Sequence, residues 1–298
     1  MKLVQYHQPG VGLRVGVAQD GQVREVRHEV AHSVLSLVEI AKDAKDLTNT
    51  VTQVLERRPG EQLALSDLCN RPSADQPYLL TPITAPQVWG AGVTYQRSAE
   101  MRDEDSGTNI YDGAYFGKRP ELFFKATPAH CVGTEANICI RSDSQRTAAE
   151  PELAVVLGQG NQIIGYTLCN DVSAWDIERE NPLYLPQSKI YQGCCALGPV
   201  LLTADAVPDP YQLELTCRIH RNGAQAYQDS CSVGRMRRKL AELVGYLVRH
   251  NPVPVGTVLS TGTGIITPEE MMLRPGDIVE LTMPEIGTLR NPVARLSA

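Results

Sequence analysis

The sequence of 298 residues has few aromatic side chains, no long hydrophobic run and no excess of basic charge. Aromatic residues make up 5% of the chain, with 3 Phe and 2 Trp, so a folded core must be mainly aliphatic. No apolar run is long enough for a membrane-spanning helix, which needs about 18 residues or more. A net charge of −6 and a pI near 5.6 give no bulk electrostatic reason to bind nucleic acid or an anionic membrane. We therefore expect neither as a partner.

The eight cysteines include no Cys-x-x-Cys pair. That absence excludes a zinc ribbon and a thioredoxin-type redox motif. Several cysteines, such as Cys139 and Cys169, lie in apolar runs, where a reduced thiol behaves as a small hydrophobe. The first residues also lack the apolar run of a secretory signal. These features predict reduced thiols and a cytoplasmic location.

The composition, 42% hydrophobic and 21% charged, is that of a folded protein. Residues 1–80 combine short strand-like runs with helical spacing of apolar residues, and a polar, proline-bearing stretch at 70–76 follows. Beyond residue 81, short β-branched runs alternate with Gly and Pro turns, without regular strand–helix alternation. We predict a β-rich α+β fold in which a small N-terminal α/β accessory domain, residues 1–80, precedes a catalytic domain, residues 81–298. The larger domain is expected to be a mixed β-sandwich, roll or barrel.

The expected strands of the larger domain are Leu153–Leu157, Gln162–Leu168, Val200–Thr203, Gln212–His220, Thr257–Ser260 and Asp277–Met283. One helix is expected after Asp171 and another over residues 233–250, which carries apolar residues on one face. The basic residues at 235–239 are expected to form the solvated face of this second helix. No Gly-x-Ser-x-Gly elbow occurs, so serine-hydrolase chemistry has little support.

The strongest local feature is a pair of glutamates, Glu150 and Glu152, at the start of an apolar run. Residues i and i+2 of a strand point to the same face, so both carboxylates would meet beside a buried strand. Asp171 ends the next strand-like run, which would pair with the first across a turn at 160–161. Carboxylates gathered at low dielectric need a cation or a proton. Three oxygen ligands without a His or thiolate cluster favour Mg²⁺, Mn²⁺ or Ca²⁺ over zinc. The alternative is a solvated acidic strand edge.

Two lysines and a glycine-rich turn are further candidates. Lys189 lies in an otherwise uncharged segment, where loss of solvent would suit proton transfer or oxyanion binding; a snorkelling surface lysine is the alternative. If residues 120–125 form a strand, Glu121 and Lys125 share one face. The segment Thr261–Gly264 follows a strand and offers backbone N–H groups and hydroxyls to an anion, without the lysine of a P-loop.

In their order along the chain, these motifs resemble the fumarylacetoacetate hydrolase superfamily. The resemblance covers roughly residues 81–298 and rests on Trp89–Tyr95, Pro120–Lys125, Glu150–Glu152, Asn170–Ala174, Gln187–Lys189 and Thr261–Thr263. Within the superfamily, the whole chain is similar to dehydratases of 2-keto-3-deoxy sugar acids. The resemblance implies a β-rich domain that holds a divalent cation, usually Mg²⁺, and a homodimer or homotetramer.

The resemblance also assigns roles to particular residues. Glu150, Glu152 and Asp171 would be the metal ligands, in agreement with strand geometry. The catalytic residues would be Glu121, as acid or base, and Lys189. The residues expected to bind substrate are Lys125, Gly262 and Thr263.

Two positions depart from the family pattern. Ser98 stands where hydrolytic members typically carry a histidine, and a serine cannot act as that base at neutral pH. This departure argues against C–C bond hydrolysis. Trp175 stands where the family motif usually has Arg, which bears on substrate preference.

The sequence therefore predicts a metal-dependent dehydratase of a 2-keto-3-deoxy sugar acid, such as 2-keto-3-deoxy-D-arabinonate or a related pentonate. The product would be 2,5-dioxopentanoate, formed through a metal-stabilised enolate. The alternatives are C–C hydrolysis of an acylpyruvate or diketo acid and a non-catalytic sugar-acid-binding module.

Overall fold

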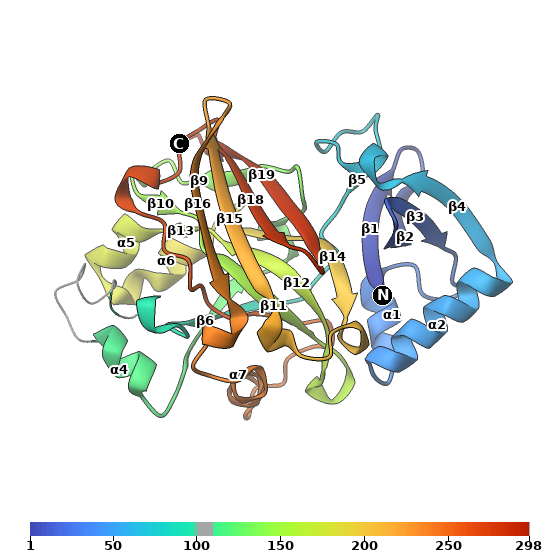
Figure 1. The fold of residues 1–298 in the computed structure, drawn as a ribbon, viewed down its shortest axis with the longest axis horizontal. Coiled ribbons are helices and arrows are strands. Elements are labelled where there is room, and N and C mark those ends of the chain that lie inside the picture. Colours follow the sequence, from blue (N-terminus) through green and yellow to red (C-terminus); the bar gives the residue numbers. More distant parts are fainter. Residues whose placement is uncertain (99, 101–109, 298) are drawn as a thin grey trace.

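The computed structural model describes residues 1–98, 100 and 110–297 (Figure 1). Its helices are α1 Val34–Ile40, α2 Ala44–Arg57, α4 Ile110–Phe116, α5 Trp175–Glu180, α6 Leu185–Lys189 and α7 Leu240–Leu247. The strands up to residue 150 are β1 Lys2–Gln8, β2 Gly12–Gln19, β3 Gln22–Val26, β4 Pro59–Ala64, β5 Tyr78–Leu79, β6 Val88–Gly92, β7 Glu121–Ala126, β8 Cys131–Val132, β9 Ile138–Ile140 and β10 Thr147–Ala148. The later strands are β11 Pro151–Leu157, β12 Ile163–Asp171, β13 Ser173–Ala174, β14 Cys195–Thr203, β15 Glu214–Arg221, β16 Ala224–Ser232, β17 Val258–Ser260, β18 Ile278–Met283 and β19 Gly287–Arg295.

One large mixed sheet runs through the molecule in the order β4-β3-β2-β1-β14-β12-β11-β17-β6-β7, with β5 beside β1 and β8 beside β14. Its central strands β11 and β14 are buried at every position. Strands covered on both faces consist of continuous apolar runs rather than alternating ones, which is the pattern seen in these segments. Glu150 and Glu152 therefore lie at the start of a fully buried strand, and Asp171 ends its neighbour β12.

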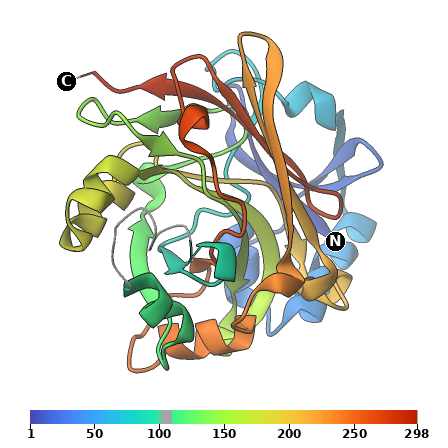
Figure 2. The same cartoon turned by 60° about the vertical axis from the view of Figure 1, so that its left-hand side comes forward.

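A second sheet, in the order β16-β15-β18-β19-β9, packs against the first. Leu153 and Leu168 from the large sheet share one hydrophobic core with Leu215, Leu281 and Leu289 from the smaller sheet. The predicted β-rich fold with packed mixed sheets is confirmed. In Figures 1 and 2, helices α4, α5 and α6 lie on the side of the molecule away from the N-terminal strands.

The first 80 residues extend the large sheet rather than standing apart from it. Strand β1 pairs antiparallel with β14, with Leu3 opposite Leu201. The side chains of Ser33 and Asp43 cap helices α1 and α2 by accepting backbone N–H groups of the first turn. The two helices then bury apolar side chains, Leu37 of α1 among them, against this part of the sheet. The division into two domains near residue 80 stays a prediction.

The expected strands and the helix after Asp171 are present, but the second expected helix is shorter. It begins at Leu240 instead of residue 233, because residues 233–235 form a separate 3₁₀ turn. The prediction of a solvated basic face is wrong for Arg238, which is 5% exposed. Its guanidinium donates to the carbonyl of Gly117 at 2.6 Å and pairs with Glu242 at 2.6 Å. These partners replace the water that burial removes.

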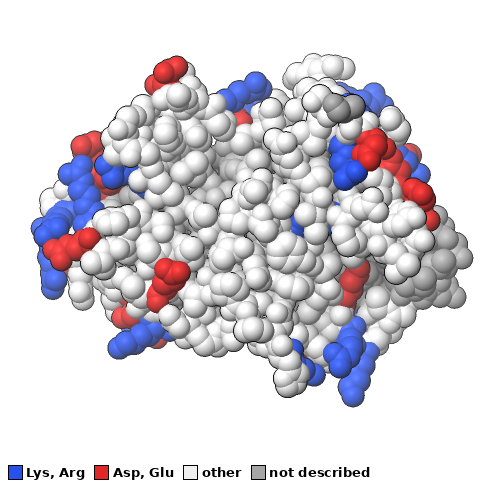
Figure 3. Space-filling model, turned by 180° about the vertical axis from the view of Figure 1, so that it is seen from behind, with Lys and Arg blue, Asp and Glu red and all other residues white. Residues whose placement is uncertain are grey.

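The surface carries charges of both signs. Figure 3 shows Lys and Arg side chains interspersed with Asp and Glu around the rim of one face, without a broad patch of one sign. This face therefore offers a polyanion no extended basic surface. Among the described residues, no helix is long and apolar enough to cross a membrane.

Candidate metal centre and active site

The hairpin of β11 and β12 brings three carboxylates together. Pro151 is opposite Asn170, so Glu150 and Asp171 face each other, and the backbone N–H of Asp171 donates to the Glu150 carbonyl at 2.9 Å. The side chain of Glu152 joins them from two residues along β11. One carboxylate oxygen of each residue lies within 4.8 Å of the others, and all three side chains are buried. The alternative of a solvated acidic edge is therefore wrong.

Lys189 provides one of the positive charges beside this cluster. It is the last residue of α6, and its Nζ donates to Glu150 Oε2 at 2.6 Å, Asp171 Oδ2 at 2.9 Å and Ser173 Oγ at 2.7 Å. The side chain is 1% exposed, and the ammonium lies 5.2 Å from the centre of the Phe123 ring. The snorkelling alternative is excluded, because three acceptors and an aromatic face hold this ammonium inside the protein.

Lys125 holds Asp171 from the opposite side. Its fully buried Nζ lies 2.5 Å from Asp171 Oδ1 and donates to the carbonyls of Val172 and Lys189 at 3.0 and 2.7 Å. Burial lowers the pKa of Lys125, but the adjacent Asp171 carboxylate opposes this effect, and the net pKa lies above the usual value. The residue does not line the cavity described below. Lys125 donates its hydrogen bonds to the framework behind Asp171, and its contact with substrate stays a prediction.

Two donors, one from the last residue of β17 and one from the turn after it, fix Glu152. Ser260 Oγ and the backbone N–H of Gly262 both donate to Glu152 Oε2, at 2.5 and 2.7 Å. Burial, followed by the charge of Asp171, raises the pKa of Glu152 to about 8. Gly262 has φ +93°, and an added Cβ would lie 2.0 Å from Thr94 Oγ1, so only glycine fits here. Its N–H was expected to meet substrate but instead orients a carboxylate.

A small polar cavity of about 10 Å³ lies between these groups, which is space for roughly one water molecule or ion. It is lined by Ala91, Gly92, Val93, Ser98, Phe123, Glu150, Glu152, Asp171, Lys189, Gly262 and Thr263. Of the eight predicted site residues, six line this cavity. The other two are Glu121 and Lys125.

Glu121 lies next to the cavity wall. It begins β7 directly opposite Gly92 of β6, and a Cβ added to Gly92 would lie 2.0 Å from Glu121 Oε2. The Glu121 carboxylate therefore rests over the backbone of a residue that lines the cavity. Any side chain at position 92 would therefore displace Glu121.

Ser98 and Thr263 occupy other parts of the wall. Ser98 is 2% exposed and follows the turn at Thr94–Tyr95. Thr263 Oγ1 donates to the carbonyl of Ile265 at 3.0 Å and accepts its N–H at 3.1 Å. None of the histidines among the described residues lines the cavity.

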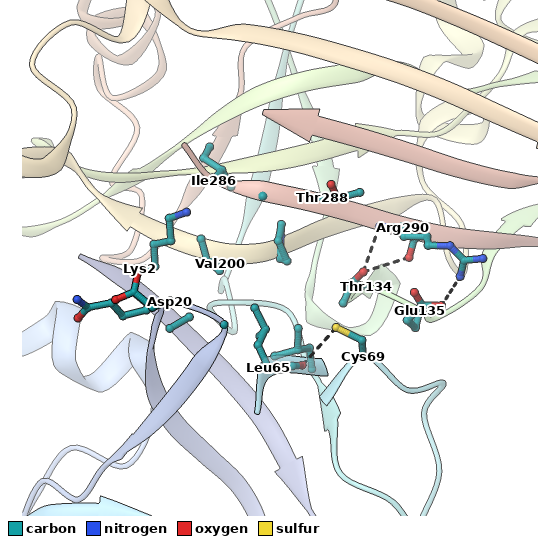
Figure 4. A pocket seen from close by; sticks show the side chains of 16 residues that line it. Lys2, Asp20, Leu65, Cys69, Thr134, Glu135, Val200, Ile286, Thr288 and Arg290 are labelled. Atoms are coloured by element: carbon teal, nitrogen blue, oxygen red, sulfur yellow. Dashed lines mark hydrogen bonds and ion pairs between the residues drawn. The ribbon is translucent and has the colours of Figure 1, made fainter. Parts of the chain in front are cut away.

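A larger cavity elsewhere in the molecule lacks this chemistry. It measures about 370 Å³ and lies between the N-terminal strands and the segments around Val200 and Ile286 (Figure 4). Arg290 and Glu135 form an ion pair at 2.6 Å along its wall. Because this cavity holds no group of carboxylates, acid–base and metal chemistry point to the smaller one.

The carboxylate cluster fits a divalent cation in donor type and in charge. Its three ligand groups are hard oxygen donors, the kind preferred by Mg²⁺, with Mn²⁺ and Ca²⁺ as alternatives. Three carboxylates face only two ammonium groups, those of Lys125 and Lys189. Burial of Glu152, followed by the nearby charge of Asp171, raises the pKa of Glu152. A bound cation would remove the need for a proton there.

Sequence reasoning missed three hydrogen-bond partners of the carboxylates and of Lys189. Ser260 donates to Glu152, Ser173 accepts from Lys189, and the indole N–H of Trp175 donates to Glu150 Oε1 at 2.7 Å. Ser173 and Trp175 follow Asp171 closely in the sequence, which was the available signal. The position of Ser260, at the end of an apolar strand, gave no indication of its partner.

Replacing Lys125 by methionine is expected to destabilise the fold. Lys125→Met keeps the length of the side chain but removes one of the two positive charges that neutralise the buried Asp171 carboxylate. This loss is expected to lower the free energy of unfolding by about 3–5 kcal/mol. Urea denaturation without added metal measures this change. The matched control is the exposed Lys45 of α2, where the same substitution should change stability by less than about 0.5 kcal/mol. A loss below about 1 kcal/mol at position 125 would contradict the assigned role.

Mg²⁺ affinity is expected to rise with pH up to about 8. Below the raised pKa of Glu152, about 8 in the metal-free protein, this carboxyl holds a proton that must leave before a cation binds. The affinity should therefore fall about tenfold for each pH unit below this value and level off above it. Isothermal titration calorimetry between pH 6 and 9, in buffers of different ionisation enthalpy, measures both affinity and proton release. A flat affinity and no released proton would refute the expectation.

Comparison with known proteins agrees with this site. Residues 87–294 match the family model described as the fumarylacetoacetate (FAA) hydrolase C-terminal domain. A 2-dehydro-3-deoxy-D-arabinonate dehydratase of Saccharolobus solfataricus is 50% identical over 219 residues, which cover 72% of this chain and 74% of that protein. A probable 2-keto-3-deoxyxylonate dehydratase of Haloferax volcanii is 46% identical over 213 residues, covering 71% and 73%.

A solved structure of similar fold carries a metal and a product. The structure described as 2-keto-3-deoxy-D-arabinonate dehydratase complexed with magnesium and 2,5-dioxopentanoate superposes with a TM-score of 0.81. The two proteins are 36% identical, and the alignment covers 100% of each chain. From the matched domain and these relatives, the chain belongs to the fumarylacetoacetate hydrolase family.

Proposed function

We propose that this protein is a metal-dependent hydro-lyase that dehydrates a 2-keto-3-deoxy sugar acid, either 2-keto-3-deoxy-D-arabinonate or a related pentonate, to 2,5-dioxopentanoate. The observation that carries the proposal is the buried cluster of Glu150, Glu152 and Asp171 with Lys189 hydrogen-bonded into it. The names of the two relatives that are 50% and 46% identical over the aligned residues support the reaction class. The product in the similar solved structure supports the chain length of the substrate.

Glu150, Glu152 and Asp171 are the proposed ligands of Mg²⁺. When bound, the cation would polarise the keto and carboxylate oxygens of a 2-keto acid and stabilise the negative charge that develops as a proton leaves C3. The protein contributes the orientation of the ligands, because Ser260, Gly262 and Trp175 hold them by hydrogen bonds.

Two residues are proposed to move the protons. Three acceptors stabilise the ammonium form of Lys189, so it is suited to donate a proton to the C4 hydroxyl as this group leaves as water. Glu121, beside the cavity wall at Gly92, is suited to accept the C3 proton. Tautomerisation after loss of water places the aldehyde at C5. Thr263 and the backbone of Gly262 form the wall against which the substrate is proposed to lie.

Ser98 favours dehydration over hydrolysis of a C–C bond. It lines the cavity where the resemblance places the histidine base of hydrolytic members, and a serine hydroxyl does not accept a proton at neutral pH. Among the described residues that line the cavity, the carboxylates are the three assigned to the metal. Proton transfer therefore falls to Glu121 and Lys189.

The cellular setting is proposed from other features. A cytoplasmic location is supported by the eight free cysteines, five of which are buried as thiols. A homodimer or homotetramer is expected from the family resemblance, with a small keto-acid as the partner molecule and without nucleic acid.

The unchanged protein with Mg²⁺ is expected to convert a 2-keto-3-deoxypentonate into a semialdehyde. Each stereoisomer is incubated in turn, and the aldehyde is followed by coupled oxidation or by mass spectrometry as a loss of one water. Glu150→Gln, or a chelator, should abolish turnover because the ligand set loses a charge or the cation. Activity that survives both treatments would refute the metal role. Release of pyruvate from an acylpyruvate without dehydration would establish the hydrolase alternative, and binding without turnover would establish a binding module.

Glu121→Gln is expected to lower kcat by about 10²–10⁴-fold while Mg²⁺ affinity stays within a few-fold of the unchanged protein. The substitution removes a proton acceptor without touching a proposed ligand. Deuterium exchange at C3 of the substrate, followed by NMR, should be lost together with turnover. Glu39→Gln, at an exposed position of α1, is the control and should leave both quantities unchanged. Retained C3 exchange in Glu121→Gln would show that another group takes this proton.

A further inference from the structure

Trp175 contacts the candidate metal site through its indole N–H. The first residue of α5, it donates from Nε1 to Glu150 Oε1 at 2.7 Å, while Lys189 donates to the other oxygen, Oε2, at 2.6 Å. Each oxygen of Glu150 thus has its own donor, one neutral and one cationic. The two donors come from different helices, so the plane of this carboxylate is fixed at both ends.

The backbone around Trp175 explains why the indole reaches Glu150. Strand β13, which ends at Ala174, pairs with β10, which ends at Ala148, two residues before Glu150. The N–H of Trp175 itself donates to the carbonyl of Arg146 at 2.8 Å. This short ladder ties the start of α5 to the segment that leads into β11.

The indole ring is enclosed and cannot turn away easily. It is 7% exposed and packs in a small apolar cluster with Ala148, Ile266 and Met272. On the ring face, the guanidinium carbon of Arg179 lies 5.0 Å from the ring centre. Arg179 lies one helical turn after Trp175, so α5 itself provides part of the enclosure. The rotamer that directs Nε1 at Glu150 is thereby held.

We propose that Trp175 is a positioning residue that orients Glu150 for a divalent cation and reports cation binding through its indole. The inference rests on the metal site of the proposed function. A neutral donor fixes the carboxylate without cancelling its charge, whereas a cationic donor at the same place would compete electrostatically with the metal. Neutralisation of Glu150 by a cation changes the field at the indole, so the emission of Trp175 is expected to respond.

The chain offers a matched control, because it has two tryptophans, and both indoles donate to a side-chain oxygen. Trp89 Nε1 donates to Gln87 Oε1 at 3.0 Å, and its ring packs edge-on against Phe124. Trp175→Phe and Trp89→Phe therefore remove the same kind of hydrogen bond, but only the first bond involves a carboxylate of the cluster. The Trp89→Phe variant also leaves Trp175 as the single tryptophan, whose emission is selected by excitation near the red edge of the tryptophan band.

The experiment titrates the unchanged protein and both variants with MgCl₂ in the absence of substrate. Calorimetry gives the dissociation constant, tryptophan emission gives a second readout, and thermal unfolding tests whether each variant is folded. Trp175→Phe should raise the dissociation constant by roughly 10–100-fold, whereas Trp89→Phe should change it less than twofold. In Trp89→Phe, the emission of Trp175 should change saturably with the same dissociation constant.

A second substitution covers the case in which Trp175→Phe does not fold. β-(3-benzothienyl)alanine replaces the indole N–H by sulfur with nearly the same shape, and it is introduced at position 175 in the Trp89→Phe background. A similar loss of Mg²⁺ affinity supports the inference, since packing is preserved. Affinity within twofold of the unchanged protein overturns it while leaving the metal site intact. Failure of the unchanged protein to bind Mg²⁺ would overturn the metal site and this inference together.

Discussion

The structure around the site depends on burying three carboxylates at the end of one β-hairpin. Coulomb repulsion at low dielectric makes such a cluster costly unless positive charge and hydrogen-bond donors surround it. Lys125 and Lys189 flank Asp171 from opposite sides, each within about 3 Å of a carboxylate oxygen. They leave one formal negative charge uncompensated. Burial first, and the charge of Asp171 second, raise the pKa of Glu152.

The fold can be understood as the framework that delivers these donors. Strand β7 supplies Lys125, the end of α6 supplies Lys189, the segment after β17 supplies Gly262, and α5 supplies Trp175. Each donor connects one element to the β11–β12 hairpin. Lys125 also donates to the carbonyl of Lys189 and so holds the end of α6 in place. A change in any one of these elements therefore alters the orientation of a proposed ligand. None of these donors comes from the N-terminal strands. These strands are connected to the hairpin through the sheet, because β1 pairs with β14 and β14 pairs with β12.

The sequence allowed the carboxylates to be predicted but not the full role of their surroundings. The i, i+2 spacing of Glu150 and Glu152 and the short turn before the next strand are local features, so their convergence with Asp171 followed from strand geometry. The complete burial of Lys125 could not be predicted in this way. The alternation of side chains along a strand shows which residues point to the same face, but it does not show which other elements cover that face. For the same reason the N–H of Gly262 was assigned to substrate. Its partner, Glu152, lies 110 residues away and is defined only by the pairing of β11 with β17.

In the proposed function, metal binding and proton transfer fall to different groups around one cavity. Tyr95, near the cavity, has a pKa raised strongly by burial, so its phenol stays neutral, and Ser98 cannot act as a base at neutral pH. Glu150, Glu152 and Asp171 are each engaged by donors that hold them in place. Glu121 differs, because it approaches the cavity wall from a separate strand, over a glycine, and is not a member of the carboxylate cluster. A carboxylate placed outside the ligand set but beside it is suited to take a proton from a molecule held at the metal, since moving that proton does not disturb the ligands.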